Sequence, residues 1–215
     1  EPVATDGIFY TADRKPLFGA IAVDGAGGAT GTLASGVAAV EFLYAPLTPA
    51  PDAWNDFTLL SADPGTSGFA IYPAAGLVDG RYLFAVRATD RAGNQSLLMT
   101  GGTTPTYVAG VTEEVVIDNT DPTGSVSAPA AGFVKAKQPV FTVNATDASA
   151  GVKQVLFRYA LSGSPTTYTT ISTDLAEPYA ADWGSIELTH GVTYLLSAVV
   201  TDKIGCTYEV PAVTI

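Results

Sequence analysis

Apolar residues along this chain fall at alternate positions or in short runs, and turn-forming residues interrupt them at short intervals. In residues 37–44, for example, Val40, Phe42 and Tyr44 occupy every second position. Side chains at alternate positions share one face of a β-strand, so this pattern indicates a strand with one buried face. No segment shows the period of an α-helix. The pattern therefore predicts an all-β protein.

The strand pattern occurs twice. Residues 152–159 repeat the pattern of residues 37–44 at an offset of 115 (152 − 37), and residues 194–202 repeat residues 82–90 at an offset of 112 (194 − 82). An apolar run ends at Ile117, and Asp118-Asn119-Thr120-Asp121-Pro122 then supplies turn formers and a proline, which cannot continue a sheet ladder. We therefore expect two tandem domains, residues 1–118 and 119–215.

Each copy contains about seven short strands with turn signals every 8–12 residues, which is the pattern of an immunoglobulin-like (Ig-like) sandwich. In that fold a tyrosine near the start of strand F lies two residues before the second cysteine of the inter-sheet disulfide. Here Tyr82 precedes Phe84 and Tyr194 precedes Leu196, so the cysteine position is apolar in both copies. The chain has one cysteine, Cys206, and can form no internal disulfide. The prediction is two tandem Ig-like sandwiches held by packing alone.

Four stretches carry a family resemblance: residues 118–122, 152–159, 177–183 and 191–202. They resemble the bacterial Ig-like repeats of large surface and secreted proteins. The resemblance implies an extracellular, non-enzymatic structural module, a spacer or an adhesive stalk segment. Its partners would be neighbouring Ig-like domains of the same polypeptide and a glycan or protein receptor.

The first copy departs from the repeat in two ways. It carries two insertions, residues 26–36 and 98–110, which we expect to be variable surface loops lying side by side. It also lacks an obvious first strand before Gly7, so we expect this domain to be truncated there.

The charge of the chain limits its partners. Twenty-one acidic and ten basic residues give a net charge of −11, which repels phosphate backbones and anionic membranes and favours cations. We therefore expect no nucleic-acid partner. No apolar run approaches the roughly 18 residues of a membrane helix, so we expect no membrane insertion in this segment.

Oxygen-bearing side chains gather at the joint between the copies. Asp147 and Asp202 each end a strand of the second copy, at the end of the domain that Asp118, Asn119 and Asp121 enter. Calcium takes six to eight oxygen ligands at a flexible site, so these five residues are candidate ligands of a Ca²⁺ ion. Aspartate and asparagine also form ordinary tight turns, and a plain turn is the alternative interpretation.

A second function class is a carbohydrate-binding accessory module of a secreted hydrolase. Trp54, in a proline-rich loop, is the candidate for stacking on a sugar ring, whereas Trp183 is expected inside the core. The single histidine, His190, lies in a turn without a nearby serine or cysteine nucleophile. We find no catalytic set and predict that the chain is not an enzyme. Cys206 occupies the position that Asn94 holds in the first copy, and its role is open.

Overall fold

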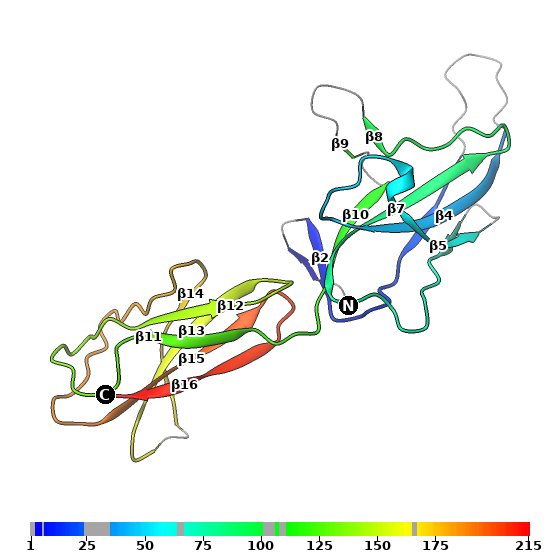
Figure 1. Cartoon of the computed structure of the whole chain (residues 1–215). Coiled ribbons are helices and arrows are strands. Elements are labelled where there is room, and N and C mark those ends of the chain that lie inside the picture. The colour runs from blue at the N-terminus through cyan, green and yellow to red at the C-terminus, as the bar shows by residue number, and fades with distance from the viewer. Residues whose placement is uncertain are drawn as a thin grey trace. The chain divides into compact units, whose positions relative to one another are not determined.

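The computed structural model describes residues 3–5, 7–23, 35–63, 67–100, 106–107, 111–164 and 167–215. The chain divides into two compact units, Glu1–Asp118 (unit 1) and Asn119–Ile215 (unit 2). Within the described residues the regular structure is β-strand, apart from a single 3₁₀ turn at Trp54–Asp56 (Figure 1). The prediction of an all-β protein is confirmed.

Unit 2 consists of two antiparallel sheets. The larger sheet has the order β14-β13-β15-β16, and the smaller one pairs β11 with β12. An isolated bridge between Thr142 and Ala180 adds a short third segment to the smaller sheet. The strand bounds are β11 Thr123–Ala128, β12 Thr142–Thr146, β13 Val152–Leu161, β14 Thr169–Asp174, β15 Tyr194–Asp202 and β16 Thr207–Thr214.

Unit 1 has a larger main sheet of order β1-β2-β10-β7-β4-β5 and two ribbons, β3-β6 and β8-β9. The bounds are β1 Val3–Thr5, β2 Ile8–Thr11, β3 Gly19–Ile21, β4 Val37–Pro46, β5 Thr58–Asp63, β6 Ser67–Phe69, β7 Gly80–Asp90, β8 Met99–Thr100, β9 Thr106–Tyr107 and β10 Thr112–Ile117.

The two units repeat one another in detail. Strands β4 and β13 pair with β7 and β15 in the same register, and a β-bulge interrupts both pairings after the first residue, Val37 or Val152. A second bulge interrupts the pairing with the next strand after Phe42 in unit 1 and after Phe157 in unit 2. Because bulges set the local bend and twist of a strand, the two sheets share their shape as well as their order. The tandem Ig-like repeat is confirmed.

Aromatic pairs link the sheets at equivalent places. Phe18 meets Phe42 edge to face at 5.5 Å between ring centroids, and Phe141 meets Phe157 in the same way at 4.9 Å. Phe84 and Leu196, the residues at the cysteine position of strand F, are both buried. Core packing therefore replaces the inter-sheet disulfide, as the sequence predicted.

The strand-F tyrosines tie their hydroxyl groups to the preceding loop. Tyr82 donates a hydrogen bond to the carbonyl of Val78 at 2.9 Å, and the backbone N–H of Thr189 donates to the Tyr194 hydroxyl at 3.2 Å. A buried tyrosine hydroxyl needs such a partner, because an unpaired polar group in the core is destabilising.

The start of unit 1 differs from the expectation that no strand precedes Gly7. Strand β1 lies at Val3–Thr5 and forms a hairpin with β2, and β2 pairs in parallel with β10. These strands could not be recognised from the sequence, because they are three and four residues long and show little alternation of apolar and polar residues. In unit 2 the first strand, β11, instead pairs with β12.

The main sheet of unit 1 is covered on both faces. Tyr82 and Phe84 pack on one face, while Leu83 and Ala85, which alternate with them, join a second cluster on the other face. The 3₁₀ turn and the β8-β9 ribbon cover that second face (Figure 1). The second cluster comprises Leu43, Ala45, Phe57, Leu83, Ala85 and Leu98, with Leu47, Trp54 and Tyr107 packed against it.

Leu98 and Tyr107 of the insertion at residues 98–110 therefore belong to the packed structure, and the expectation of a surface loop is wrong for these two residues; residues 101–105 and 108–110 lie outside the described residues. Leu98 is buried, and the Tyr107 hydroxyl donates a hydrogen bond to the carbonyl of Pro51. Of the other insertion, residues 26–36, the described part is residues 35–36, so its expected position beside the first lies outside the described residues.

Substitutions at two neighbouring leucines test whether this insertion stabilises unit 1 by covering the second face of its main sheet. Leu98 is 6% exposed and Leu97 is 69% exposed. Leu98→Ala should lower the free energy of unfolding of unit 1 by about 2–5 kcal/mol, as truncation of a buried leucine does. Leu97→Ala should change it by less than about 0.5 kcal/mol. Urea denaturation measures both, and equal small losses would show that the insertion does not contribute to the core.

Candidate functional site

Two aspartates predicted as metal ligands come together at one end of unit 2. Asp147 directly follows β12, and Asp202 is the last residue of β15. Val152, the first residue of β13, pairs with Asp202, and the N–H of Lys203 donates to the carbonyl of Gly151 at 3.1 Å. The loop from Asp147 to Gly151 therefore runs beside Asp202.

One oxygen of Asp202 organises the turn that follows it. Its Oδ1 accepts hydrogen bonds from the backbone N–H groups of Ile204 at 2.9 Å, Gly205 at 2.6 Å and Cys206 at 2.9 Å. Gly205 has a φ of +108°, a conformation that side chains other than glycine rarely adopt. The turn thus fixes the carboxylate in one orientation.

Asp147 is held in the same manner. Its Oδ1 accepts from the N–H of Ser149 at 3.2 Å and from the N–H of Gly151 at 2.7 Å. Gly151, with a φ of +80°, again permits the backbone to fold back on the aspartate. Both carboxylates are therefore positioned by backbone groups rather than by flexible side chains.

The remaining oxygen of each carboxylate is unsatisfied. Oδ2 of Asp147 and Oδ2 of Asp202 are buried and have no hydrogen-bond partner among the residues that the structure describes. Asp202 as a whole is 0% exposed. A buried carboxylate oxygen without a partner is costly, and a bound cation is one group that can offset this cost.

A divalent cation can provide that compensation. Asp147 and Asp202 each offer a carboxylate oxygen, and these two oxygens lie within 4.8 Å of one another. An ion can contact two oxygens that are up to 4.8 Å apart at about 2.4 Å from each, inside the range of calcium–oxygen distances. Without an ion, two carboxylates at this distance repel each other by about 3 kcal/mol at an effective dielectric constant of about 20.

The other three predicted ligands lie on the joint segment. Asp118 is the last residue of unit 1; it is buried, and its N–H donates to the carbonyl of Thr11 at 3.0 Å. Asn119 and Asp121 are exposed and lead into β11. The pairing of Thr123 with Thr146 brings the start of β11 to the end of unit 2 where Asp147 lies.

Trp54, the candidate sugar-stacking residue, is half-buried. Its ring packs at 5.9 Å from Phe57, and the Arg87 guanidinium lies 5.6 Å from the ring centroid. Arg87 in turn donates hydrogen bonds to the Glu41 carboxylate at 2.6 Å and 3.0 Å, and these hydrogen bonds raise the Arg87 pKa. Trp54 therefore contributes to the second cluster of unit 1. Trp183 is buried and donates to the carbonyl of Pro139, as expected for a core residue.

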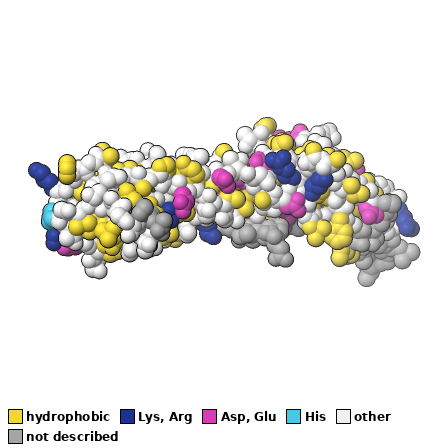
Figure 2. All heavy atoms as spheres, turned by 90° about the horizontal axis from the view of Figure 1, so that it is seen from below, with side chains coloured by type: hydrophobic (Ala, Val, Ile, Leu, Met, Phe, Trp, Pro, Cys, Tyr) yellow, Lys and Arg dark blue, Asp and Glu magenta, His cyan; other side chains and the backbone are white. Residues whose placement is uncertain are grey.

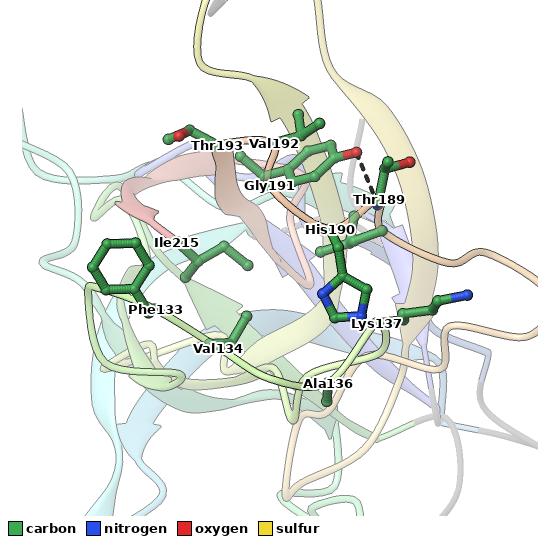
Figure 3. A pocket seen from close by; sticks show the side chains of 12 residues that line it. Phe133, Val134, Ala136, Lys137, Thr189, His190, Gly191, Val192, Thr193 and Ile215 are labelled. Atoms are coloured by element: carbon green, nitrogen blue, oxygen red, sulfur yellow. Dashed lines mark hydrogen bonds between the residues drawn. The ribbon is translucent and has the colours of Figure 1, made fainter.

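His190 lies at the end of unit 2 opposite the two aspartates, beside a shallow pocket (Figure 3). Figure 3 shows its ring between Val134, Ala136 and Lys137. Among the described residues that line the pocket there is neither a carboxylate nor a cysteine. A histidine without a nucleophile or an acidic partner does not form a recognisable catalytic arrangement.

An exposed apolar ribbon in unit 1 was not identified from the sequence. Gly19 pairs with Phe69, so both residues lie on the same face of the β3-β6 ribbon. The Phe69 ring covers Gly19 so closely that a Cβ on residue 19 would lie 2.5 Å from the ring. Phe69 is 64% exposed and Ile21 is 82% exposed, and Leu17 and Ile71 extend the strip. Uncharged alternation across residues 16–23 was the sequence signal that could have revealed it.

The outer face of the corresponding sheet in unit 2 is largely polar. It carries Thr142, Asn144 and Thr146 on β12, and the hydroxyl groups of Ser127 and Thr142 are hydrogen-bonded at 2.8 Å. The fold itself therefore does not require an apolar surface at this place.

Charged groups are dispersed over the surface. On the face drawn in Figure 2, acidic and basic side chains are scattered among neutral ones, without a continuous basic area among the described residues. No helix in the described part of the chain is long and apolar enough to cross a membrane.

No protein-family model matches this chain, and no curated protein is significantly similar to it. Several solved structures are similar. The fibronectin(III)-like modules of Clostridium thermocellum CbhA are 18% identical at a TM-score of 0.33, with 84% of this chain and 80% of that chain covered. A tetra-tandem repeat in the extending region of a large adhesion protein is 17% identical at a TM-score of 0.39, with 95% and 47% covered. Domains A168–A170 of titin are 14% identical at 0.38, with 80% and 51% covered. This chain thus spans about half of the latter two structures.

The unsatisfied oxygens lead to a prediction for the metal-free protein. Asp147→Asn removes one of the two neighbouring negative charges, so the charge repulsion disappears while Oδ1 keeps its backbone partners. The free energy of unfolding of unit 2 in chelator should therefore rise by about 1–3 kcal/mol. Trp183 fluorescence during urea denaturation, in a Trp54→Phe background, reports on this unit.

Asp182→Asn is the matched control. Asp182 also accepts a backbone hydrogen bond, from Gly184 at 3.0 Å, but this contact is exposed. It should change the stability by less than about 0.5 kcal/mol. A clear loss of stability in Asp147→Asn would show that repulsion between the two carboxylates does not destabilise unit 2.

Proposed function

We propose that this chain is a structural segment of a bacterial cell-surface or secreted multidomain protein, acting as a spacer or adhesive stalk. The observation that supports this most is the repetition of one scaffold across a short joint. Strand β10 ends at Ile117 and β11 begins at Thr123, so residues 118–122 connect the two units. Five residues span at most about 18 Å when extended, so the segment that connects the units is short.

The packing of the units supports the same role. Each unit has its own buried clusters, and the described members of each cluster all belong to one unit. Domains that pack independently can be repeated along a polypeptide without changing their own fold. Neighbouring Ig-like domains of the same polypeptide are the partners that this function requires, and an extracellular location accords with it.

The proposed stalk is stiffened by calcium at the joint. The ion binds Oδ2 of Asp147 and Oδ2 of Asp202, and Asp118, Asn119 and Asp121 supply further oxygens from the connecting segment. Support comes from the two buried oxygens within unit 2 and from the covalent bond that joins Asp118 to Asn119. One ion bound to residues of both units would restrict their relative motion.

Calorimetry and small-angle scattering test this proposal together. Titration of the wild-type chain with calcium should give one binding event, and scattering should show a longer, sharper maximum dimension in calcium than in chelator. A ligand at 100 times its Kd stabilises the folded state by about 2.7 kcal/mol, so the Tm of unit 2 should rise as well.

The variant Asp147→Asn combined with Asp202→Asn is the control, because it removes both buried charges. Its scattering should be identical in calcium and chelator. If the wild-type chain neither binds millimolar calcium nor changes its scattering, the joint is a plain turn and the stiffening proposal is wrong.

A second candidate function, a ligand-binding accessory module, is favoured by the apolar ribbon of unit 1. Leu17, Ile21, Phe69 and Ile71 form a largely exposed strip whose counterpart in unit 2 is mostly polar. Exposed apolar strips of this kind occur at binding surfaces. The Phe69 ring, lying over Gly19, offers the flat face on which a sugar or another ring can stack.

A glycan array distinguishes this candidate from the spacer. The wild-type chain should bind at least one glycan, and Phe69→Ser should abolish the binding without lowering the Tm. Val140→Ser, at an exposed apolar position of unit 2, should leave binding unchanged. A silent array with the wild-type chain would remove the carbohydrate-binding candidate.

A further inference from the structure

The turn that follows strand F, which is β7 in unit 1 and β15 in unit 2, has the same backbone in both units. The N–H of Asp90 donates to the carbonyl of Asn94 at 2.9 Å, and the N–H of Asp202 donates to the carbonyl of Cys206 at 3.1 Å. Gly93 has a φ of +91°, close to that of its counterpart in unit 2. The two turns therefore share their backbone hydrogen bond and their glycine conformation, although Asp202 is buried and the side-chain contacts of Asp90 are exposed.

The first oxygen of each aspartate also has the same role. Oδ1 of Asp90 accepts from the N–H groups of Ala92 at 2.9 Å and Asn94 at 2.8 Å. These contacts correspond to those that Oδ1 of Asp202 receives from Ile204 and Cys206. Backbone geometry thus accounts for one oxygen in each unit and leaves the second to a side chain.

The second oxygen is where the units differ. Oδ2 of Asp90 accepts a hydrogen bond from Nδ2 of Asn94 at 2.8 Å. Cys206 stands at the equivalent position of unit 2, and Oδ2 of Asp202 is buried without a partner among the described residues. An amide is a strong donor, whereas a thiol is a weak one. The side chain four residues after the aspartate is therefore one difference between the two turns, and Asp90 also has a side-chain hydrogen bond with Ser35.

We infer that this position decides whether the strand-F end of a unit depends on a cation: asparagine satisfies the aspartate internally, and cysteine leaves its Oδ2 available to a divalent ion. The inference rests on the proposed calcium site and adds the residue that controls it. Cys206 is a specificity-determining residue here without being a ligand. Unit 1 has an internally satisfied aspartate, and unit 2 has a cation-dependent one.

Exchanging the side chain in unit 2 tests the inference. In Cys206→Asn, the introduced amide should donate to Oδ2 of Asp202, as Asn94 does to Asp90. The calcium Kd, measured by calorimetry under reducing conditions, should rise at least tenfold. In chelator, the Tm of unit 2 should be higher than in the wild-type chain, because a buried oxygen gains a partner.

Cys206→Ala is the matched control, since it removes the thiol without adding a donor. Its calcium affinity should match that of the wild-type chain, and its Tm in chelator should not rise above the wild-type value. Equal calcium affinity in Cys206→Asn and the wild type would overturn the inference and leave the calcium site standing. If the wild type binds no calcium, the proposed site fails, and the Tm in chelator then decides alone: an unchanged Tm in Cys206→Asn overturns the inference.

The reverse exchange in unit 1 provides a readout that does not involve calcium. The side chain and backbone of Asn94 lower the pKa of Asp90. In Asn94→Cys, this pKa should move up toward the ordinary aspartate value, which a carbon-detected NMR titration measures. An unchanged Asp90 pKa would show that the amide does not control the carboxylate, against the inference.

Discussion

Packing between two sheets is the interaction on which both units depend, because a chain with one cysteine cannot link its own sheets covalently. In unit 2, Phe141, Phe157 and Leu196 meet between the sheets and are essentially inaccessible to solvent. The edge-to-face contact between the two phenylalanines adds to the burial of their surface. Everything at the ends of the sandwich, including the aspartate turns, is positioned by strands that this contact holds in place.

The repetition of the scaffold separates what the fold requires from what each unit adds to it. Strand register, bulges, aromatic pairs and the strand-F turn occur in both units, so they belong to the scaffold. The partner of the strand-F aspartate and the polarity of the outer face of the smaller sheet differ between the units. Differences on a common backbone are where distinct binding properties can arise at little cost in stability.

Unit 1 also shows how an inserted segment can become part of a fold. Its main sheet carries apolar residues on both faces, as in the run Leu83-Phe84-Ala85, and a sheet of this kind must be covered on both sides. The 3₁₀ turn, Leu98 and Tyr107 provide that cover. The equivalent outer face of unit 2 instead carries charged groups among its apolar residues, with Arg158 lying 4.2 Å from the Tyr168 ring and paired with Glu209 at 3.1 Å. Unit 2 therefore needs no second cover.

The sequence by itself determined the class of fold, the repeat and the identity of the core positions. Alternation in residues 37–44 and 152–159 reports which side chains face inward, and this depends only on the geometry of a strand. It also placed Asp147 and Asp202 at the same end, because that follows from the order of strands.

Only the tertiary structure decided the hydrogen-bond partners of the aspartates, the pairing of the short strands, and which aromatic residues are packed or exposed. It gave both aspartates backbone partners for one oxygen and left the other buried, a distinction that depends on turn geometry around Gly151 and Gly205. It paired β2 with β10, assigned Trp54 to a cluster and exposed the Phe69 ribbon. Each of these outcomes depends on contacts between segments far apart in the chain, and local pattern carries no information on which distant surfaces will meet.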